Sequence, residues 1–194
     1  KNKIKYDLGI DLNQTLFQID VINYSKKSNE VAKVKILGES TNLNYLVKKI
    51  ILETKDSIFS LNNFDISKNF KITDFEKVNF DYLDNNQRKN DLIIKKVNEN
   101  NYLVKGKSFN LSKLIDDILF SDANNTKKIF DNKNRFFEIN FINNYIDKDH
   151  KILNLKGNFQ IQGNDVYDLS LNSLFPNKES LSMSIKSKDN QKVT

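Results

Sequence analysis

The feature that most constrains this chain is a period of two in its hydrophobicity. In the first segment Ile4, Tyr6, Leu8, Ile10 and Leu12 take every second position, and the residues between them are mostly charged. Successive side chains of a β-strand point to opposite faces of the sheet, so this alternation indicates a strand with one dry face and one wet face. Antiparallel sheets typically show this pattern. The sequence therefore predicts a mainly antiparallel β protein.

The same alternation recurs in later segments. Their apolar members include Phe17, Ile19, Val21, Val78, Phe80, Leu153, Leu155, Phe159 and Ile161. Polar stretches such as 25–29 and 162–165 separate these segments and are typical of hairpin loops. We expect residues 3–37 and 64–107 to be mainly antiparallel strands that follow one another in a meander.

Two segments break the alternation and resemble each other without a gap. Residues 38–52 and 106–120, which start 68 positions apart, share the pattern G-x-S-x-N-L-x-x-L-[VI]-x-x-I-[IL]-[LF]. Each follows an alternating segment and opens with Gly, which lets the chain turn out of a strand. An internal match of this length indicates a strand–helix unit that is used twice.

The shared pattern predicts one short amphipathic helix in each copy, near 42–53 and near 110–121. Its apolar residues recur at spacings of three and four, which places them on one side of a helix. Asn42 and Asn110 stand just before these stripes, and Asn is a favoured N-cap because its side chain accepts a hydrogen bond from the first turn. The predicted fold class is α+β: mainly β with two short helices, in an antiparallel meander with a repeat of about 68 residues.

Two short helices are too few to cover the dry face of a sheet with so many strands. The sheet must either close on itself or stay open as a curved, groove-like sheet with an apolar lining. An apolar groove can hold acyl chains, because burial of apolar surface makes no geometric demand on the ligand. We expect the lining to comprise Ile4, Tyr6, Leu8, Ile10, Leu12, Phe17, Ile19, Val21, Val78, Phe80, Leu153, Leu155, Phe159 and Ile161. The alternative is a structural or adhesive closed β-sandwich that binds no ligand.

The composition argues against catalysis and metal binding. The chain has 194 residues with no Cys and one His, so thiolate catalysis, Cys-based metal sites and multi-histidine sites are excluded. The one histidine, His150, lies in a polar turn, while Asp116 and Asp117 are adjacent and so face different ways on a helix. Ser40 and Ser108 have no G-x-S-x-G motif around them. We expect no enzyme activity, no catalytic or metal-binding residue and no cofactor.

The positive charge does not by itself indicate a nucleic-acid partner. The formal net charge is +6, but Arg88 and Arg135 are the only arginines among the 31 basic residues. The lysines are dispersed in runs of at most two, whereas nucleic-acid binders cluster their basic residues and favour Arg for phosphate. We therefore expect these lysines to cover solvated faces, and we expect no nucleic-acid partner.

The second copy of the shared pattern resembles an element of a known family. Residues 106–115 read G-K-S-F-N-L-S-K-L-I and follow a predicted strand. They resemble the G-x-x-F-D-L-S-P-L-L element of the AsmA-like proteins of Gram-negative envelopes, in particular of the YhdP/TamB-like branch. Residues 152–161 and 167–171 are similar to the strand pairs that follow this element. The family's Asp is Asn110 here, and its Pro is Lys113.

This resemblance implies a long, groove-like β-structure in the periplasm and movement of phospholipid between the inner and outer membranes. It further implies an inner-membrane anchor elsewhere in the parent chain. Residues 1–194 are then expected to be a single repeat-containing segment of a longer protein, which agrees with a first residue other than Met. The expected partners are phospholipid acyl chains, and the expected location is the periplasm, anchored to the inner membrane through the parent protein.

Overall fold

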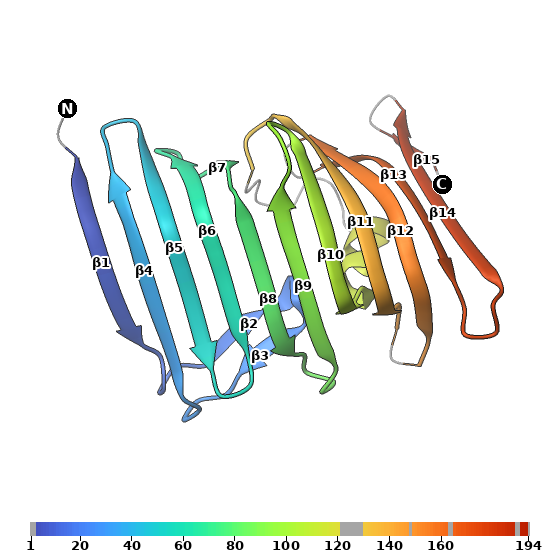
Figure 1. Cartoon of the computed structure of the whole chain (residues 1–194), viewed down its shortest axis with the longest axis horizontal. Helices are drawn as coiled ribbons and strands as arrows, with labels where there is room; N and C mark the ends of the chain where they lie inside the picture. Colours follow the sequence, from blue (N-terminus) through green and yellow to red (C-terminus); the bar gives the residue numbers. More distant parts are fainter. Residues whose placement is uncertain (1–2, 121–129, 148, 163–164, 189–190, 194) are drawn as a thin grey trace.

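The computed structural model describes residues 3–120, 130–147, 149–162, 165–188 and 191–193. This part of the chain is mainly β, with one large open sheet and one α-helix (Figure 1). In order across the sheet, the strands are β1 (Ile4–Asp11), β4 (Ala32–Ser40), β5 (Asn44–Thr54), β6 (Ile58–Ser67), β8 (Lys77–Leu83), β9 (Lys89–Lys96), β10 (Asn101–Asn110), β11 (Asn134–Tyr145), β12 (Lys151–Gln162), β13 (Asp165–Leu174), β14 (Ser180–Lys188) and β15 (Gln191–Val193). The other elements are β2 (Phe17–Ile19), the 3-10 turn η1 (Asp20–Ile22), β3 (Tyr24–Lys26), β7 (Ile72–Asp74) and α1 (Ser112–Phe120).

The prediction of antiparallel pairing is confirmed for all neighbours in the described part of the sheet except one. Strands β10 and β11 run parallel, and α1 lies between them in the sequence, as parallel neighbours require a crossover connection. Strand β7 pairs with β6 beside the main strand order, and β2 pairs with β3 as a separate hairpin. Strands β1 and β15 lie at opposite ends of the order. The sheet therefore stays open, and the closed sandwich of the alternative prediction is not formed.

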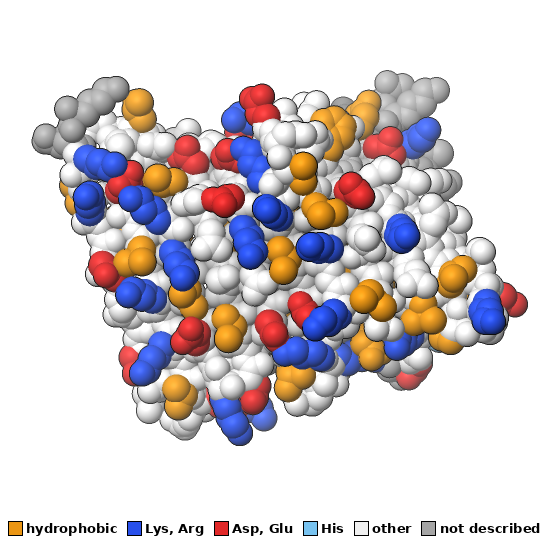
Figure 2. Space-filling view, viewed as in Figure 1, with side chains coloured by type: hydrophobic (Ala, Val, Ile, Leu, Met, Phe, Trp, Pro, Cys, Tyr) orange, Lys and Arg blue, Asp and Glu red, His pale blue; other side chains and the backbone are white. Residues whose placement is uncertain are grey.

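The alternation gives the sheet one polar and one apolar face. Figure 2 shows the polar face, where Lys, Asp and Glu side chains are interspersed with scattered apolar ones. The β2–β3 hairpin and α1 both lie behind the sheet in the view of Figure 1, on the apolar face. Consistent with this placement, the Tyr24 ring of β3 lies 4.7 Å from that of Phe59 and 5.7 Å from that of Tyr82. The hairpin and the helix thus form a partial second layer.

The predicted helix near 42–53 is wrong, because residues 44–54 form strand β5. The register between β4 and β5 shifts at Lys48, which is an extra residue in β5 and forms a β-bulge. Val47 and Ile50 on either side of the bulge consequently face the same side of the sheet, although they are three positions apart. A spacing of three is also the spacing of a helical stripe. The bulge therefore accounts for the helix-like pattern.

The second predicted helix is confirmed as α1, within the predicted range near 110–121, of which residue 121 lies outside the described residues. Leu111, Leu114 and Ile115 pack against the core from this part of the chain. Because only one of the two matching segments is helical, the expected strand–helix repeat of 68 residues is not supported by the structure. The described part of the chain has one such unit, β10–α1–β11.

Gly106 and Gly157 lie where the neighbouring strand comes too close for a side chain. A Cβ at Gly106 would lie 2.0 Å from the carbonyl oxygen of Asp91, and a Cβ at Gly157 would lie 2.0 Å from that of Ser170. Both distances are far below van der Waals contact. Glycine at these positions allows β10 to approach β9 and β12 to approach β13.

Candidate functional site

The strand register aligns the apolar side chains of the sheet into rows that run across the strands. One row, which we call the central row, connects eleven strands through directly paired residues. Its members are Leu8, Ile36, Ile50, Leu61, Val78, Ile94, Val104, Ile139, Gly157, Leu171 and Met183. With neighbouring strands about 4.8 Å apart, such a row extends for roughly 50 Å. No position in it carries a polar side chain.

A second row runs beside the central row, and each of its members lies two positions along its strand from a member of the central row. Its members are Ile10, Val34, Leu52, Phe59, Phe80, Leu92, Gly106, Phe141 and Leu155. Together the two rows make a continuous apolar band from the first strand of the sheet to its C-terminal part. The band is the candidate functional site.

The middle of the band is covered and packed. Tyr82 on β8 is fully buried, and its hydroxyl donates a hydrogen bond to the backbone oxygen of Ile22 in η1, 3.0 Å away. Burial raises the pKa of the Tyr82 hydroxyl above its ordinary value, with a smaller contribution from the charge of Asp84. Tyr24 of the hairpin also lies against this part of the sheet. The β2–β3 hairpin therefore closes the centre of the band.

A stack of aromatic rings crosses the sheet on the other side of the central row. Phe75, which directly follows β7, lies between the rings of Phe64 and Tyr102, with centroids at 5.2 and 4.6 Å. The stack continues through Phe137 at 5.0 Å and Phe159 at a further 4.5 Å. Offset ring stacks of this kind stabilise beyond the area that they bury. Phe75 thus fastens the segment around β7 onto the apolar face.

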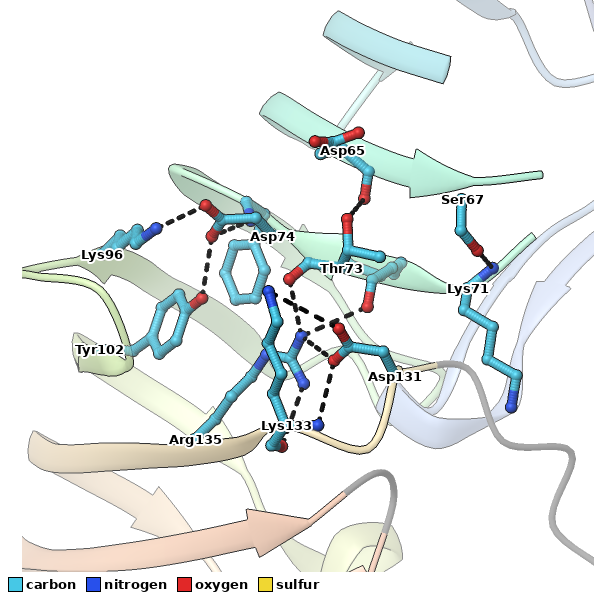
Figure 3. A network of polar contacts seen from close by, with 12 residues as sticks. Asp65, Ser67, Lys71, Thr73, Asp74, Lys96, Tyr102, Asp131, Lys133 and Arg135 are labelled. Atoms are coloured by element: carbon cyan, nitrogen blue, oxygen red, sulfur yellow. Dashed lines mark hydrogen bonds and ion pairs between the residues drawn. The ribbon is translucent and has the colours of Figure 1, made fainter. Parts of the chain in front are cut away.

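We call residues 71–75, which contain β7, the β7 strap. Figure 3 shows that it is held by the side chain of Arg135, which rises from β11 and is 1% exposed. The Arg135 Nη2 atom donates to the backbone oxygens of Ile72 and Thr73, at 3.3 and 3.0 Å, and to Asp131 Oδ1 at 2.6 Å. The guanidinium also lies over the Phe130 ring, 4.9 Å from its centroid. One buried cation therefore joins β11, the 130–131 segment and the strap.

The strap is also held through its own residue Asp74. Its carboxylate accepts hydrogen bonds from Lys96 Nζ at 2.5 Å and from the Tyr102 hydroxyl at 3.2 Å. Burial acts to raise the pKa of Asp74, but the hydrogen bond and charge of Lys96, with smaller contributions from Phe75 and Tyr102, outweigh it and hold the pKa below its ordinary value. Burial raises the pKa of the Tyr102 hydroxyl. Asp74 is therefore ionised at neutral pH and pairs with the Lys96 ammonium group.

The N-terminal end of the band is open. Leu8 and Ile10 on β1 are exposed, and Val34 and Ile36, which pair with them on β4, are only half-buried. Tyr6 is half-buried on the same face, with its hydroxyl 3.4 Å from the backbone oxygen of Leu46. The apolar band thus emerges from its covered centre onto the surface of β1 and β4.

The structure places the predicted lining residues in three environments. Ile4, Tyr6, Leu8 and Ile10 belong to β1, at the open end, whereas Leu12 directly follows β1 and packs against the core cluster. Val78, Phe80, Leu155, Phe159 and Ile161 lie in the core cluster or pack against it. Phe17, Ile19 and Val21 belong to the covering hairpin and its η1 turn, and Leu153 is half-buried beside a register shift in β12. Among the predicted lining residues on the sheet, only members of β1 are exposed, while Val21 is exposed on η1.

The predicted N-caps have different environments. Asn42 lies exposed in the β4–β5 turn and caps no helix. Asn110 is buried before α1, where its Oδ1 accepts hydrogen bonds from the backbone N–H of Ser112 at 3.2 Å and the Ser112 hydroxyl at 2.7 Å. Its Nδ2 donates to Asp84 Oδ2 at 2.6 Å, and its backbone N–H donates to Asn90 Oδ1 at 2.7 Å. Asn110 therefore joins the start of α1 to the β8–β9 turn.

We expect Asn110→Ala to lower the free energy of unfolding by about 2 kcal/mol, because it removes the donor to the buried Asp84 Oδ2 and the acceptor for the half-buried Ser112. The matched variant Asn42→Ala changes an exposed turn and should stay within about 0.5 kcal/mol of the wild type. Urea denaturation followed by circular dichroism measures both. Equal effects of the two substitutions would contradict this assignment.

The acidic and histidine side chains are the candidate ligands for a metal ion. In the part of the chain that the structure describes, no group of three or more His, Asp or Glu side chains is placed to hold a metal ion. His150 is exposed, and its Nδ1 lies 2.7 Å from Asp147 Oδ2. The Asp147 carboxylate forms hydrogen bonds with the backbone N–H of Asp149 and with the His150 ring. These bonds lower the pKa of Asp147 to about 2, and the bond from Asp149 contributes most. A hollow of about 580 Å³ lies over β1, β4 and β5, and its lining includes Gly9, Lys35 and Ile51.

Sequence reasoning missed Arg135 and Phe75, which hold the strap in place. One signal for Arg135 was available, because Arg135 takes a position of the apolar alternation that continues with Phe137 and Ile139. A charged residue on an apolar face requires buried partners. No comparable signal distinguishes Phe75.

Comparisons of the chain with protein-family models, with curated proteins and with solved structures found no match. No helix in the described ranges is both long and apolar enough to span a membrane. What the protein does is therefore argued from the apolar band itself.

Proposed function

We propose that this chain is a β-sheet module of a Gram-negative cell-envelope protein, and that its apolar band holds phospholipid acyl chains. The observation that carries the proposal is the open end of the band. Leu8 and Ile10 continue the buried rows onto the surface without a polar interruption. An exposed apolar surface that is continuous with the core usually marks a binding surface.

The chemistry of the open end suits an acyl chain. Leu8, Ile36 and Ile50 are paired across three strands, so their side chains form a strip at right angles to the strands. Covering such a strip gives about 0.8 kcal/mol for each methylene removed from water, without any hydrogen bond. The strip itself offers no side-chain donor or acceptor. It favours the chain of a lipid and leaves the headgroup unspecified.

The resemblance to the AsmA-like family supports the setting of this proposal. The segment that carries the resemblance, residues 106–115, folds as the end of β10 followed by the start of α1. On that likeness, the module belongs to the periplasm and is anchored to the inner membrane through the parent protein. Transfer of phospholipid between the two membranes is then the process in which the band takes part.

A second candidate function is a purely structural domain. The observation that favours it is the packed centre of the band, where Tyr82, Phe75 and Arg135 hold the hairpin and the strap against the sheet. A ligand cannot occupy the centre without displacing these groups. In this case the exposed residues of β1 and β4 contact polypeptide and no lipid.

The experiment that separates the two functions is mass spectrometry of lipids that co-purify with the chain from Gram-negative cells. We expect phospholipid with the wild type and a loss of at least about tenfold with Leu8→Glu, because the charge lies in the open strip. The matched control is Leu37→Glu, because Leu37 pairs with Asp7 on the polar face of the same two strands. A wild-type chain without lipid, or equal losses in both variants, would favour the structural function.

A further inference from the structure

Three of the most exposed large apolar side chains lie together at one end of the sheet. Phe70 is 75% exposed in the β6–β7 turn, Leu43 is 73% exposed in the β4–β5 turn, and Ile4 is 66% exposed at the start of β1. Ile4 pairs with Ser40, the last residue of β4 before the Leu43 turn. Figure 1 shows both turns and the start of β1 at the upper end of the sheet. We call this group of residues the apolar tip.

Direct contacts join the two turns into one surface. The Phe70 ring stacks on the Tyr45 ring, with centroids 5.8 Å apart and an interplanar angle of 13°. Lys68 Nζ lies 3.8 Å from the centroid of the Tyr45 ring and donates a hydrogen bond to Ser40 Oγ at 3.3 Å. The tip is therefore held in one arrangement by side chains from both turns.

The backbone of Phe70 is held in an unfavourable conformation. Its φ is 57°, in the left-handed region that a bulky aromatic residue rarely adopts. The turn is fixed by hydrogen bonds from the N–H of Phe70 to the oxygen of Ser67 and from the N–H of Ser67 to the oxygen of Lys71, both 2.9 Å. Asn or Gly would occupy this position at lower cost. An exposed Phe kept there at a cost to folding points to a role for its ring outside the fold.

The charges around the tip are basic. Residues 40–44 and 67–71, which form the two turns, carry Lys68 and Lys71 and no acidic residue. The nearest acid on β4, Glu39, is paired with Lys3 at 2.7 Å and with Lys48 at 3.2 Å. Asp65, on β6, accepts a hydrogen bond from the Asn44 side chain at 2.6 Å. The tip thus presents apolar side chains with two lysines, Lys68 and Lys71, beside them.

We propose that the apolar tip docks on the surface of an anionic lipid bilayer. The side chains of Phe70, Leu43 and Ile4 enter the boundary between headgroups and acyl chains, while Lys68 and Lys71 contact lipid phosphates. Exposed aromatic and aliphatic side chains beside lysines are the combination that binds such an interface. Docking goes beyond the holding of acyl chains, and it does not require the band to carry a ligand.

The test is co-sedimentation of the 194-residue chain with vesicles of phosphatidylglycerol and of phosphatidylcholine. We expect binding to phosphatidylglycerol that weakens as salt is raised. Phe70→Asn should lower the partition coefficient about tenfold, because it removes the inserted ring. It should not lower thermal stability, because Asn accepts the left-handed backbone. Leu16→Asn is the matched control, since Leu16 is 62% exposed in the loop that follows the opposite end of β1.

The lysines are tested in the same way. Lys71→Gln should weaken binding to phosphatidylglycerol about fivefold, while Lys55→Gln, in the β5–β6 turn at the other end of the sheet, should not. The proposal is overturned if neither vesicle type retains the wild type, or if Leu16→Asn weakens binding as much as Phe70→Asn. Self-association that Phe70→Asn abolishes, without vesicle binding, would also overturn it. The loss of co-purified lipid expected in Leu8→Glu tests the proposed function in a separate measurement.

Discussion

Leu155→Glu is expected to unfold the chain at 25 °C and neutral pH, whereas Leu8→Glu should leave it folded. Leu155 is 2% exposed, and its row neighbour Phe141 is equally buried. A carboxylate at that site has no partner, and burial of an unpaired charge costs several kcal/mol, which is comparable with the whole stability of a typical domain. Leu8 is 49% exposed, so a carboxylate there keeps much of its water. Circular dichroism melting of both variants measures the difference.

The pH dependence separates the charge from the loss of packing. Burial raises the pKa of a carboxyl group, so the penalty in Leu155→Glu is present at neutral pH and decreases as the pH falls toward the unfolded-state pKa of about 4.3. Leu155→Gln is the neutral control, and we expect the two variants to converge in stability near pH 4. A cooperative melt of Leu155→Glu at neutral pH, with the stability of the wild type, would contradict the burial of this site.

Local pattern alone could not distinguish Leu8 from Leu155, because both alternate with polar residues in the same way. Which of them is buried depends on the cover of the apolar face. That cover comes from the β2–β3 hairpin, the β7 strap and α1, and each of these packs on strands distant in sequence. The alternation correctly predicted the antiparallel strands and the apolar face. Tertiary packing decided which part of that face stays open.

The two segments with the same sequence pattern show how far local reasoning extends. Both have apolar residues at helical spacing, yet only the second is a helix. In the first, the bulge at Lys48 brings Val47 and Ile50 to one face of β5, so the strand satisfies the same pattern. In the second, the buried side chain of Asn110 binds Ser112 at the start of α1 and also Asp84 in a distant turn. These contacts depend on the assembled sheet and are not readable from a window of 15 residues.

Arg135→Met is expected to lower the free energy of unfolding by about 3 kcal/mol, the low end of the cost of breaking a buried ion pair. Methionine fills much of the volume but removes the donor that Arg135 supplies to the backbone oxygens of Ile72 and Thr73. The Ile72 oxygen keeps its hydrogen bond from the backbone N–H of Asp131, at 3.1 Å. The Asp131 carboxylate also loses its guanidinium partner, although its partial exposure limits that loss. Arg135→Lys should recover less than half of the free energy of unfolding that Arg135→Met loses, because one ammonium group cannot reproduce the planar set of donors of a guanidinium.

If Arg135 acts by holding the β7 strap, its removal should raise amide hydrogen exchange more in the strap than in the rest of the sheet. Amide hydrogen exchange in Arg135→Met is therefore expected to increase first at residues 72–75 and only later in β5 and β6. Arg88→Met is the matched control at the only other arginine, which stacks on Tyr145 with 4.3 Å from guanidinium to ring centroid and is half-buried. It should leave exchange at 72–75 unchanged. Faster exchange throughout the sheet in Arg135→Met, with no early change in the strap, would show that Arg135 stabilises the fold as a whole. If exchange increases early and only in the strap, the strap is the part that can detach from the apolar face. The open end of the band would then extend toward Phe75 and Tyr102.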